Sequence, residues 1–163
     1  QGVVHRDIKP ANIMYEASSD SVKVTDFGIA RVTDSSKTKT GLVLGTPSFM
    51  SPEQIAGKPV DGRSDLYSLG VMFYQMLTGR LPFEATSLTE LMYKITNAEP
   101  ADLQQYRKDL PPAYAHVILT SLAKKPAQRY QTGTDLAAAL AQLRQPTPAS
   151  PTASAPPPDI SFD

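Results

Sequence analysis

Cysteine is absent from this chain of 163 residues, and so are long apolar runs and an excess of either charge. Without cysteine there is neither a disulfide framework nor a thiolate metal site, and a cytoplasmic setting fits that composition. Lysine and arginine together number 16, as do aspartate and glutamate, so the formal net charge is zero. A dedicated nucleic-acid binder would carry a basic surface, so we expect no nucleic-acid partner. No stretch is apolar for long enough to span a membrane, and no signal peptide is visible.

The two ends of the chain differ from its middle. The first residue is Gln1 rather than methionine, so we expect the sequence to be a piece of a longer protein. Residues 145–163 contain six prolines among nineteen residues, separated mainly by alanine, serine and threonine. Such a segment cannot bury enough apolar surface to fold. We therefore predict a folded part, residues 1–144, and a disordered linker or tail, residues 145–163, for which a proline-rich ligand is the alternative reading.

The folded part is predicted to be mainly helical, with one small β-hairpin. Apolar alternation predicts strands over residues 13–15 and 22–25. Residues 28–47 lack any period and are rich in serine, threonine, lysine and glycine, which is typical of a long exposed loop. Apolar periodicity and capping residues then predict four helices, the first of them apolar on most sides and central: 63–78, 87–97 after a capping box, 112–124, and 134–144.

Three polar residues of different chemistry, Asp7, Lys9 and Asn12, lie close together near the start of the chain. Pro10 stands between them and keeps the segment from becoming a regular helix. A carboxylate can orient or deprotonate a hydroxyl group, an ammonium can neutralise phosphate charge, and an amide oxygen can hold a hard cation. The three residues therefore predict chemistry on a hydroxyl and a phosphate.

A second motif, Asp26-Phe27-Gly28, begins fourteen residues after Asn12 and follows the second predicted strand. Its carboxylate offers another oxygen ligand for a cation, and its glycine lets the chain turn sharply. The segment His5–Asn12 and this motif resemble, in this order, the catalytic loop and the metal-binding motif of protein kinases. The form Lys9-x-x-Asn12 resembles the serine/threonine pattern of that family.

Further matches follow in the family's order, and together they cover residues 5–130. Ser51-Pro52-Glu53 stands where the family usually has Ala-Pro-Glu, and Arg63–Gly70 resembles the start of a central kinase helix. The amino-acid sequence of these motifs is similar to that of the eukaryotic-like serine/threonine kinases of bacteria. The resemblance implies the large, carboxyl-terminal lobe of the kinase fold, without the small amino-terminal lobe and the first helices of the large lobe.

The resemblance implies catalytic roles for three residues. Asp7 would position the substrate hydroxyl, Lys9 would contact the transferring phosphate, and Thr46 would bridge the two on the substrate side. Taken alone, an aspartate in a loop is more often a turn-former, and a lysine is more often a solvated surface residue. The motif around them favours the catalytic reading.

The implied cofactors are ATP and Mg²⁺, with Mn²⁺ as a substitute. Asn12 and Asp26 resemble the magnesium ligands of the family, and a carboxylate binds Mg²⁺ better than an amide does. Met14 matches the position that floors the adenine pocket, although a methionine can also be a simple core residue. Thr25 would lie on the same nucleotide side.

A regulatory role is implied for Arg6, which stands next to the catalytic aspartate. A guanidinium there is a receptor for a phosphate group on the long loop. Five acceptors are candidates, and the spacing to Gly45-Thr46-Pro47 favours Thr38 and Thr40 over Thr33, Ser35 and Ser36. We predict that phosphorylation of the favoured threonines orders the loop by pairing with Arg6.

Structural support is the role implied for six further residues: His5, Phe27, Gly28, Glu53, Asp65 and Arg129. His5 is expected to pack and hydrogen-bond beneath Phe27 rather than to act as a base. Glu53 is expected to pair with Arg129 and so to close the long loop onto the helices. Asp65 is expected to accept backbone N–H groups from the catalytic loop.

The implied function is ATP-dependent phosphorylation of serine and threonine hydroxyls on proteins, carried out by the longer protein. The sequence contains no G-x-G-x-x-G loop, and a strand lysine with its helix glutamate is also missing, so we expect residues 1–163 alone to be inactive. A non-catalytic module that binds partners through the 87–97 helix or the proline-rich tail is the alternative.

Protein substrates are the expected partners, together with self-association for phosphorylation between two copies. Membrane attachment is expected only through a span beyond residue 163, which would place the chain on the cytoplasmic face of that membrane.

Overall fold

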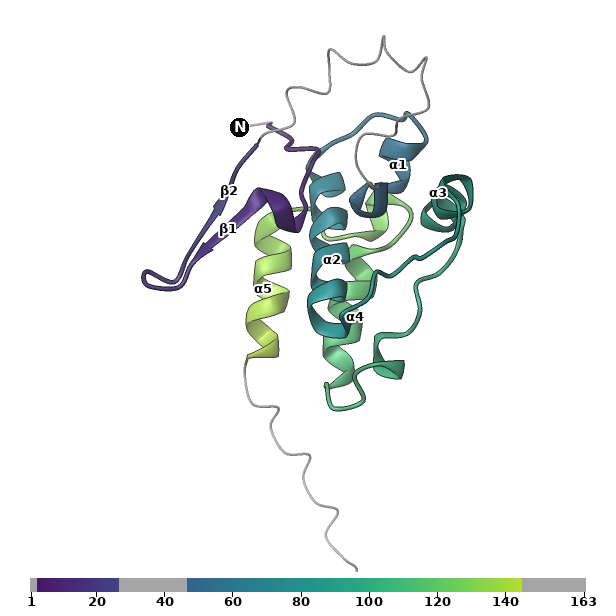
Figure 1. Cartoon of the computed structure of the whole chain (residues 1–163). Helices are drawn as coiled ribbons and strands as arrows, with labels where there is room; N and C mark the ends of the chain where they lie inside the picture. The colour runs from purple at the N-terminus through teal and green to yellow at the C-terminus, as the bar shows by residue number, and fades with distance from the viewer. Residues whose placement is uncertain (1–2, 27–46, 145–163) are drawn as a thin grey trace, which may run out of the picture.

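The computed structural model describes residues 3–26 and 47–144, which form an amino-terminal hairpin and a helical body (Figure 1). The expected mainly helical composition with one small hairpin is confirmed for these residues. Of the predicted loop over residues 28–47, residues 28–46 lie outside the described part of the chain, as does the predicted tail over residues 145–163, whereas Pro47 begins a turn of 3-10 helix. None of the helices described there has the length and hydropathy of a membrane span.

The hairpin consists of strand β1 (Ile13–Glu16) and strand β2 (Ser21–Val24), which pair antiparallel with Ile13 opposite Val24. The prediction is confirmed, although β1 ends one residue later than predicted and β2 both begins and ends one residue earlier. The turn between them uses a left-handed residue, Asp20, whose φ is 48°. Aspartate tolerates that conformation better than most residues do, because its short polar side chain forms local hydrogen bonds.

Helix α2 (Gly62–Thr78) stands in the middle of the helical body (Figure 1). Asp61 begins the helix by accepting a hydrogen bond from the backbone N–H of Arg63, and Gly79 ends it in the left-handed conformation, with φ of 71°. Eight residues of the helix are buried, on several of its sides. The sequence prediction of a central helix that is apolar on most sides is therefore confirmed.

Among the described residues, four further α-helices surround α2: α1 (Pro52–Ile55), α3 (Leu88–Asn97), α4 (Pro112–Ser121) and α5 (Gly133–Leu143). In the same part of the chain, four single turns of 3-10 helix connect them or precede them: η1 (Pro10–Asn12), η3 (Pro47–Phe49), η4 (Leu103–Gln105) and η5 (Pro126–Gln128). The sequence analysis did not predict α1, which is only one turn long.

Two predicted details of these helices are wrong. Helix α4 ends at Ser121 rather than near residue 124, because the chain becomes extended at Lys125, immediately before Pro126. The capping box predicted for α3 is only half formed. Ser87 accepts from the backbone N–H of Glu90, but the Glu90 carboxylate accepts from the N–H of Thr86 instead of reaching back to Ser87.

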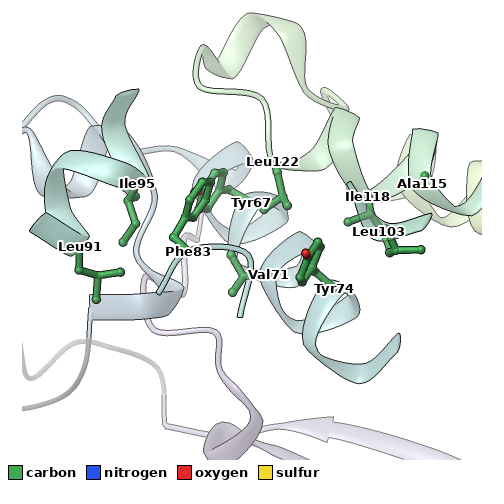
Figure 2. Packing of buried hydrophobic residues seen from close by; sticks show 10 residues of the cluster. All are labelled: Tyr67, Val71, Tyr74, Phe83, Leu91, Ile95, Leu103, Ala115, Ile118 and Leu122. Carbon is green, nitrogen blue, oxygen red and sulfur yellow. The ribbon is translucent and has the colours of Figure 1, made fainter. Parts of the chain in front are cut away.

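The main hydrophobic core lies between α2, α3 and α4 (Figure 2). Helix α2 contributes Tyr67, Val71 and Tyr74, each with no exposed surface, and α3 contributes Leu91 and Ile95. Burial of side chains of this size stabilises a fold by about 1.5–3 kcal/mol each. A second, smaller cluster joins α2, α4 and α5 and contains the predicted apolar face of α5: Leu136, Leu140 and Leu143.

Candidate active site

The Asp7 carboxylate is the centre of a small cluster formed by η1 and the segment before it. Lys9 Nζ donates to Asp7 Oδ2 at 2.8 Å, and Asn12 Nδ2 donates to the same oxygen at 3.1 Å. Asn12 Nδ2 also donates to the Asp7 backbone carbonyl at 2.8 Å. The turn of η1, with Pro10 at its start, is what folds Asn12 back onto Asp7.

Burial differs among the three residues in a way that fits a reactive site. Asn12 is buried, whereas the side chains of Asp7 and Lys9 keep 25% and 36% of their surface exposed. The Asp7 carboxylate is thus fixed in orientation by two donors and still reaches solvent. Both hydrogen bonds of the Asn12 side chain use its nitrogen, so its amide oxygen is turned away from Asp7.

The end of β2 is tied to this cluster through Thr25. Its backbone N–H donates to the Asn12 carbonyl at 2.9 Å, and its Oγ1 donates to the same carbonyl at 3.3 Å. Asp26 follows directly, with φ of 57°. Asp26 thus adopts the same left-handed conformation as Asp20, which aspartate reaches more readily than most residues other than glycine. The Asp26 side chain is exposed and, within the described segments, makes no hydrogen bond or ion pair.

His5 links the two parts of the site with both ring nitrogens. Nε2 is 2.9 Å from the Thr25 carbonyl, and Nδ1 accepts from the Asp7 backbone N–H at 3.3 Å. These contacts require the proton on Nε2, which then donates to Thr25. The imidazole is 5% exposed and bridges backbone groups, whereas the predicted packing beneath Phe27 lies outside the described residues.

Asp65, at the start of α2, fixes the backbone before Asp7. Its Oδ2 accepts from the His5 backbone N–H and its Oδ1 from that of Arg6, both at 2.8 Å. Arg6 has φ of 67°, a strained conformation that these two bonds stabilise. The backbone contact that the sequence analysis expected of Asp65 is therefore present.

Glu53 and Arg129 form a buried ion pair, also as expected. The guanidinium donates to both carboxylate oxygens, at 2.7 and 2.8 Å, and Arg129 additionally donates to backbone carbonyls of residues 63, 123 and 124. Burial opposes ionisation of Glu53, but hydrogen bonds from Arg129 and Ser64 outweigh it and lower the pKa of Glu53 to about 2. The carboxylate is thus charged at neutral pH.

One connecting residue was missed by the sequence analysis. Gln54 forms a capping box with Ser51 at the start of α1, and its Nε2 donates to the Arg6 backbone carbonyl at 2.9 Å. It therefore joins α1 to the segment that carries Asp7. The pattern Ser51-x-x-Gln54 is a capping-box signal that could have located both the helix and this residue.

Several predicted site residues lie outside the described part of the chain: Phe27, Gly28, Thr38, Thr40 and Thr46. Met14 lies in β1 with 61% of its surface exposed, so the alternative reading of a core residue does not apply among the described residues. The Arg6 side chain is exposed, while its backbone is held by Asp65 and Gln54.

The donor set fits a hard cation. The Asn12 amide oxygen and the Asp26 carboxylate are oxygen ligands of the kind that Mg²⁺ prefers, and they come from adjoining backbone segments. No group of three or more histidine, cysteine, aspartate or glutamate side chains that could hold a metal ion occurs within residues 3–26 and 47–144. An all-protein metal cage is not what Mg²⁺ needs, because it usually keeps several waters and binds substrate phosphates.

Comparison with known proteins places the residues of this site within a known protein family. The profile of the protein kinase domain matches residues 1–142, and the chain belongs to the protein kinase family.

Named relatives come from several bacteria. The chain is 47% identical over 149 residues to a probable serine/threonine-protein kinase of Corynebacterium efficiens, a match that covers 87% of this chain and 22% of the relative. It is 43% identical over 147 residues to serine/threonine-protein kinase PknB of Mycolicibacterium smegmatis, covering 88% and 23%. Serine/threonine-protein kinase pkn3 of Myxococcus xanthus is 48% identical over 138 residues, covering 78% and 25%. The chain thus spans about a quarter of the length of these relatives.

Proposed function

We propose that this chain provides the catalytic loop of a bacterial kinase that transfers phosphate from ATP to serine and threonine hydroxyls on proteins. The observation that carries the proposal is the fixed Asp7 carboxylate, which Lys9 and Asn12 contact directly in a half-exposed site. Two different polar groups, an ammonium and an amide, on one carboxylate oxygen are hard to explain by folding alone, because a loop aspartate needs no such partners to form a turn.

Asp7 accepts the proton of the substrate hydroxyl or orients that hydroxyl for attack. Two donors hold the carboxylate in one orientation, so little reorganisation is needed when the hydroxyl arrives. The Lys9 ammonium, 2.8 Å from Asp7, is placed to neutralise charge on a phosphate that approaches the same point. Thr46 completes the substrate side of the site in this proposal.

Asn12 and Asp26 are the residues that would hold Mg²⁺, with Mn²⁺ as a substitute, and Thr25 and Met14 would line the nucleotide side. Bound magnesium and ATP supply the phosphoryl group and the positive charge that balances its oxygens. The exposed Met14 side chain offers an apolar surface to a nucleotide base. His5 and Asp65 support the loop from behind through backbone hydrogen bonds, together with Phe27 and Gly28.

The residues 1–144 act in this proposal as the large lobe of the kinase fold, and the Glu53–Arg129 pair closes the segment before α1 onto the helices. A non-catalytic interaction module is less well supported, because such a module has no use for a cluster around Asp7. Arg6 is proposed to receive a phosphate on Thr38 or Thr40, and its backbone, held by Asp65, would keep the guanidinium beside the site. One copy of the protein would phosphorylate this threonine on a second copy.

The test is phosphate transfer from radiolabelled ATP by the whole protein encoded by the gene, with residues 1–163 assayed in parallel. The acceptors are three peptides that differ only in a central serine, threonine or tyrosine. We expect magnesium-dependent labelling of the serine and threonine peptides and little labelling of the tyrosine peptide by the whole protein, and none by residues 1–163 alone. A folded whole protein that labels only tyrosine, or no peptide, would overturn the proposal.

A further inference from the structure

A basic pocket lies on the helical body, formed by segments other than those that carry Asp7. Its cavity of about 330 Å³ is bounded by α1 and the residues after it, by the end of α3, and by the segment after α4. We call it the lysine pocket. Three of its lining residues are cations, Lys58, Lys124 and Lys125, and each comes after the end of a helix.

The lining of the lysine pocket carries more positive than negative charge. None of the three lysines forms an ion pair with a carboxylate of the described residues. Glu53 also lines the cavity, but Arg129 and Ser64 already donate to its oxygens. The Glu53 carboxylate is therefore already paired with Arg129, and it forms no ion pair with the lysines of the pocket. In a chain whose formal net charge is zero, three ammonium groups around one cavity, none in an ion pair among the described residues, are a local concentration of positive charge.

Lys124 is the fixed cation at the base of this arrangement. Its Nζ donates to the Ile95 carbonyl at 2.8 Å and to the Lys94 carbonyl at 3.4 Å, both in the last turn of α3. The ammonium also lies 4.0 Å from the centre of the Phe83 ring. These partners satisfy hydrogen bonds and hold the side chain in place, yet none of them carries a full negative charge. Burial lowers the pKa of Lys124 to about 8, and the nearby Glu99 carboxylate offsets only part of this effect.

Lys58 and Lys125 are exposed and flank the cavity from α1 and from η5. Their long side chains can turn toward an anion that enters, whereas Lys124 is already in position. One fixed cation and two mobile cations around a cavity can enclose a small, highly charged anion. Cations on a flat surface would be less suited to this. A phosphate monoester carries a charge of about −1.5 to −2 and three acceptor oxygens, so it can engage all three ammonium groups, whereas a carboxylate carries a single charge.

We propose that the lysine pocket binds a phosphate group, carried either by free inorganic phosphate or by a phosphorylated side chain of a protein. The site is separate from the proposed catalytic cluster and uses none of its residues. A bound phosphate would add negative charge beside Lys124 to that of Glu99, and it would bridge α1, α3 and the segment after α4. The α3 helix would thereby be held more firmly against the helical body.

The test compares two double charge reversals of equal size in the whole protein. Lys58→Glu with Lys125→Glu removes the two adaptable cations, while Lys124 is left unchanged because it anchors α3. Lys23→Glu with Lys108→Glu is the matched control, since both residues are exposed lysines outside the pocket. Binding of inorganic phosphate, of a phosphothreonine peptide and of the same unphosphorylated peptide is measured by calorimetry at constant ionic strength.

We expect saturable binding of phosphate or of the phosphothreonine peptide, but not of the unphosphorylated peptide. The pocket variant should lose at least about tenfold in affinity, the usual effect of removing hydrogen bonds to a charged group. The control variant should remain within about twofold of the unchanged protein, because its lysines lie elsewhere. If inorganic phosphate binds and the phosphothreonine peptide does not, the ligand is the free anion. If the phosphothreonine peptide binds, the ligand is a phosphorylated protein. Equal losses in both variants, or no saturable binding of either ligand, would overturn the proposal.

Discussion

Both terminal guanidinium nitrogens of Arg129 donate hydrogen bonds to the carboxylate of Glu53, which lies 76 positions earlier in the sequence. The arginine side chain has no exposed surface and the glutamate side chain has 6%. The same guanidinium stacks on Tyr67 of the main core, with its central carbon 4.9 Å from the ring centre. The ion pair therefore joins α1, α2 and the segment after α4 at one buried point.

Breaking this pair from one side should be costly. Glu53→Ala leaves the Arg129 charge buried without its partner, so we expect the free energy of unfolding to fall by about 3–5 kcal/mol. Urea unfolding followed by circular dichroism measures the change. Glu84→Ala is the control, because Glu84 is exposed and its side chain makes no ion pair in the described segments, so a change within about 0.5 kcal/mol is expected. A loss for Glu53→Ala as small as that of the control would contradict the account.

Acid should weaken the same pair in a defined pH window. The pKa of Glu53 is lowered from an ordinary 4.5 to about 2 in the folded state, so the unfolded chain takes up this proton first as the pH falls. The stabilisation from Glu53 is complete above pH 4.5 and is lost as the pH falls through about 2. Unfolding free energy measured across this window should fall more steeply for the unchanged protein than for Glu53→Gln. Parallel curves would show that Glu53 does not titrate in this way.

The crossing of α2 and α4 depends on a glycine. A Cβ added at Gly70 would lie 2.7 Å from the Cβ of Ser121, which is closer than real Cβ contacts come. We expect Gly70→Ala to destabilise the fold by about 1–3 kcal/mol through overpacking. Adding Ser121→Gly should recover part of the loss by removing the clashing atom.

Gly62→Ala provides the matched control for that substitution. Gly62 is the first residue of the same helix, and an added Cβ meets nothing within 4 Å. Alanine there should leave stability unchanged or raise it by less than about 1 kcal/mol, because alanine favours helix. Thermal unfolding distinguishes the two, and equal effects of the two alanines would refute the proposed close contact.

Asp65 should limit local opening of the segment that carries Asp7. Asp65→Asn keeps one acceptor oxygen and removes the charge that holds the backbone N–H groups of His5 and Arg6. We expect faster amide hydrogen exchange at these two positions, since opening of the segment becomes less costly. Asp20→Asn, in the hairpin turn, is the control and should leave both exchange rates unchanged. Unaltered exchange in the Asp65 variant would mean that other contacts hold this segment.

The sequence predicted those features that depend on local pattern. The α2 helix was located by its apolar spacing and by Gly79, and the hairpin by its alternating residues. Helix α1 was missed because it is a single turn whose existence depends on the Ser51–Gln54 capping box rather than on periodicity. The α3 capping box failed because Glu90 has competing partners in Thr86 and Lys94, which the sequence does not rank.

Long-range contacts of the site were predictable only in part. Family motifs indicated that Asp65 contacts the catalytic loop and that Glu53 pairs with Arg129, although no local pattern connects such distant positions. The Gln54 contact to the Arg6 carbonyl and the base of the lysine pocket were not predicted. Both are contacts between separate elements of the fold. The spacing of side chains within one element does not indicate which other element it will contact.

Asp7→Asn in the whole protein gives the most direct test of the account. The amide preserves the shape of the side chain but cannot take the hydroxyl proton, and single-turnover phosphate transfer to a serine peptide measures the consequence. We predict that the transfer rate falls by about 10²–10⁴-fold, while the dissociation constant for ATP stays within about twofold of its value in the unchanged protein. Asp20→Asn should transfer at the unchanged rate. An Asp7→Asn protein that transfers phosphate as fast as this control would contradict the central claim.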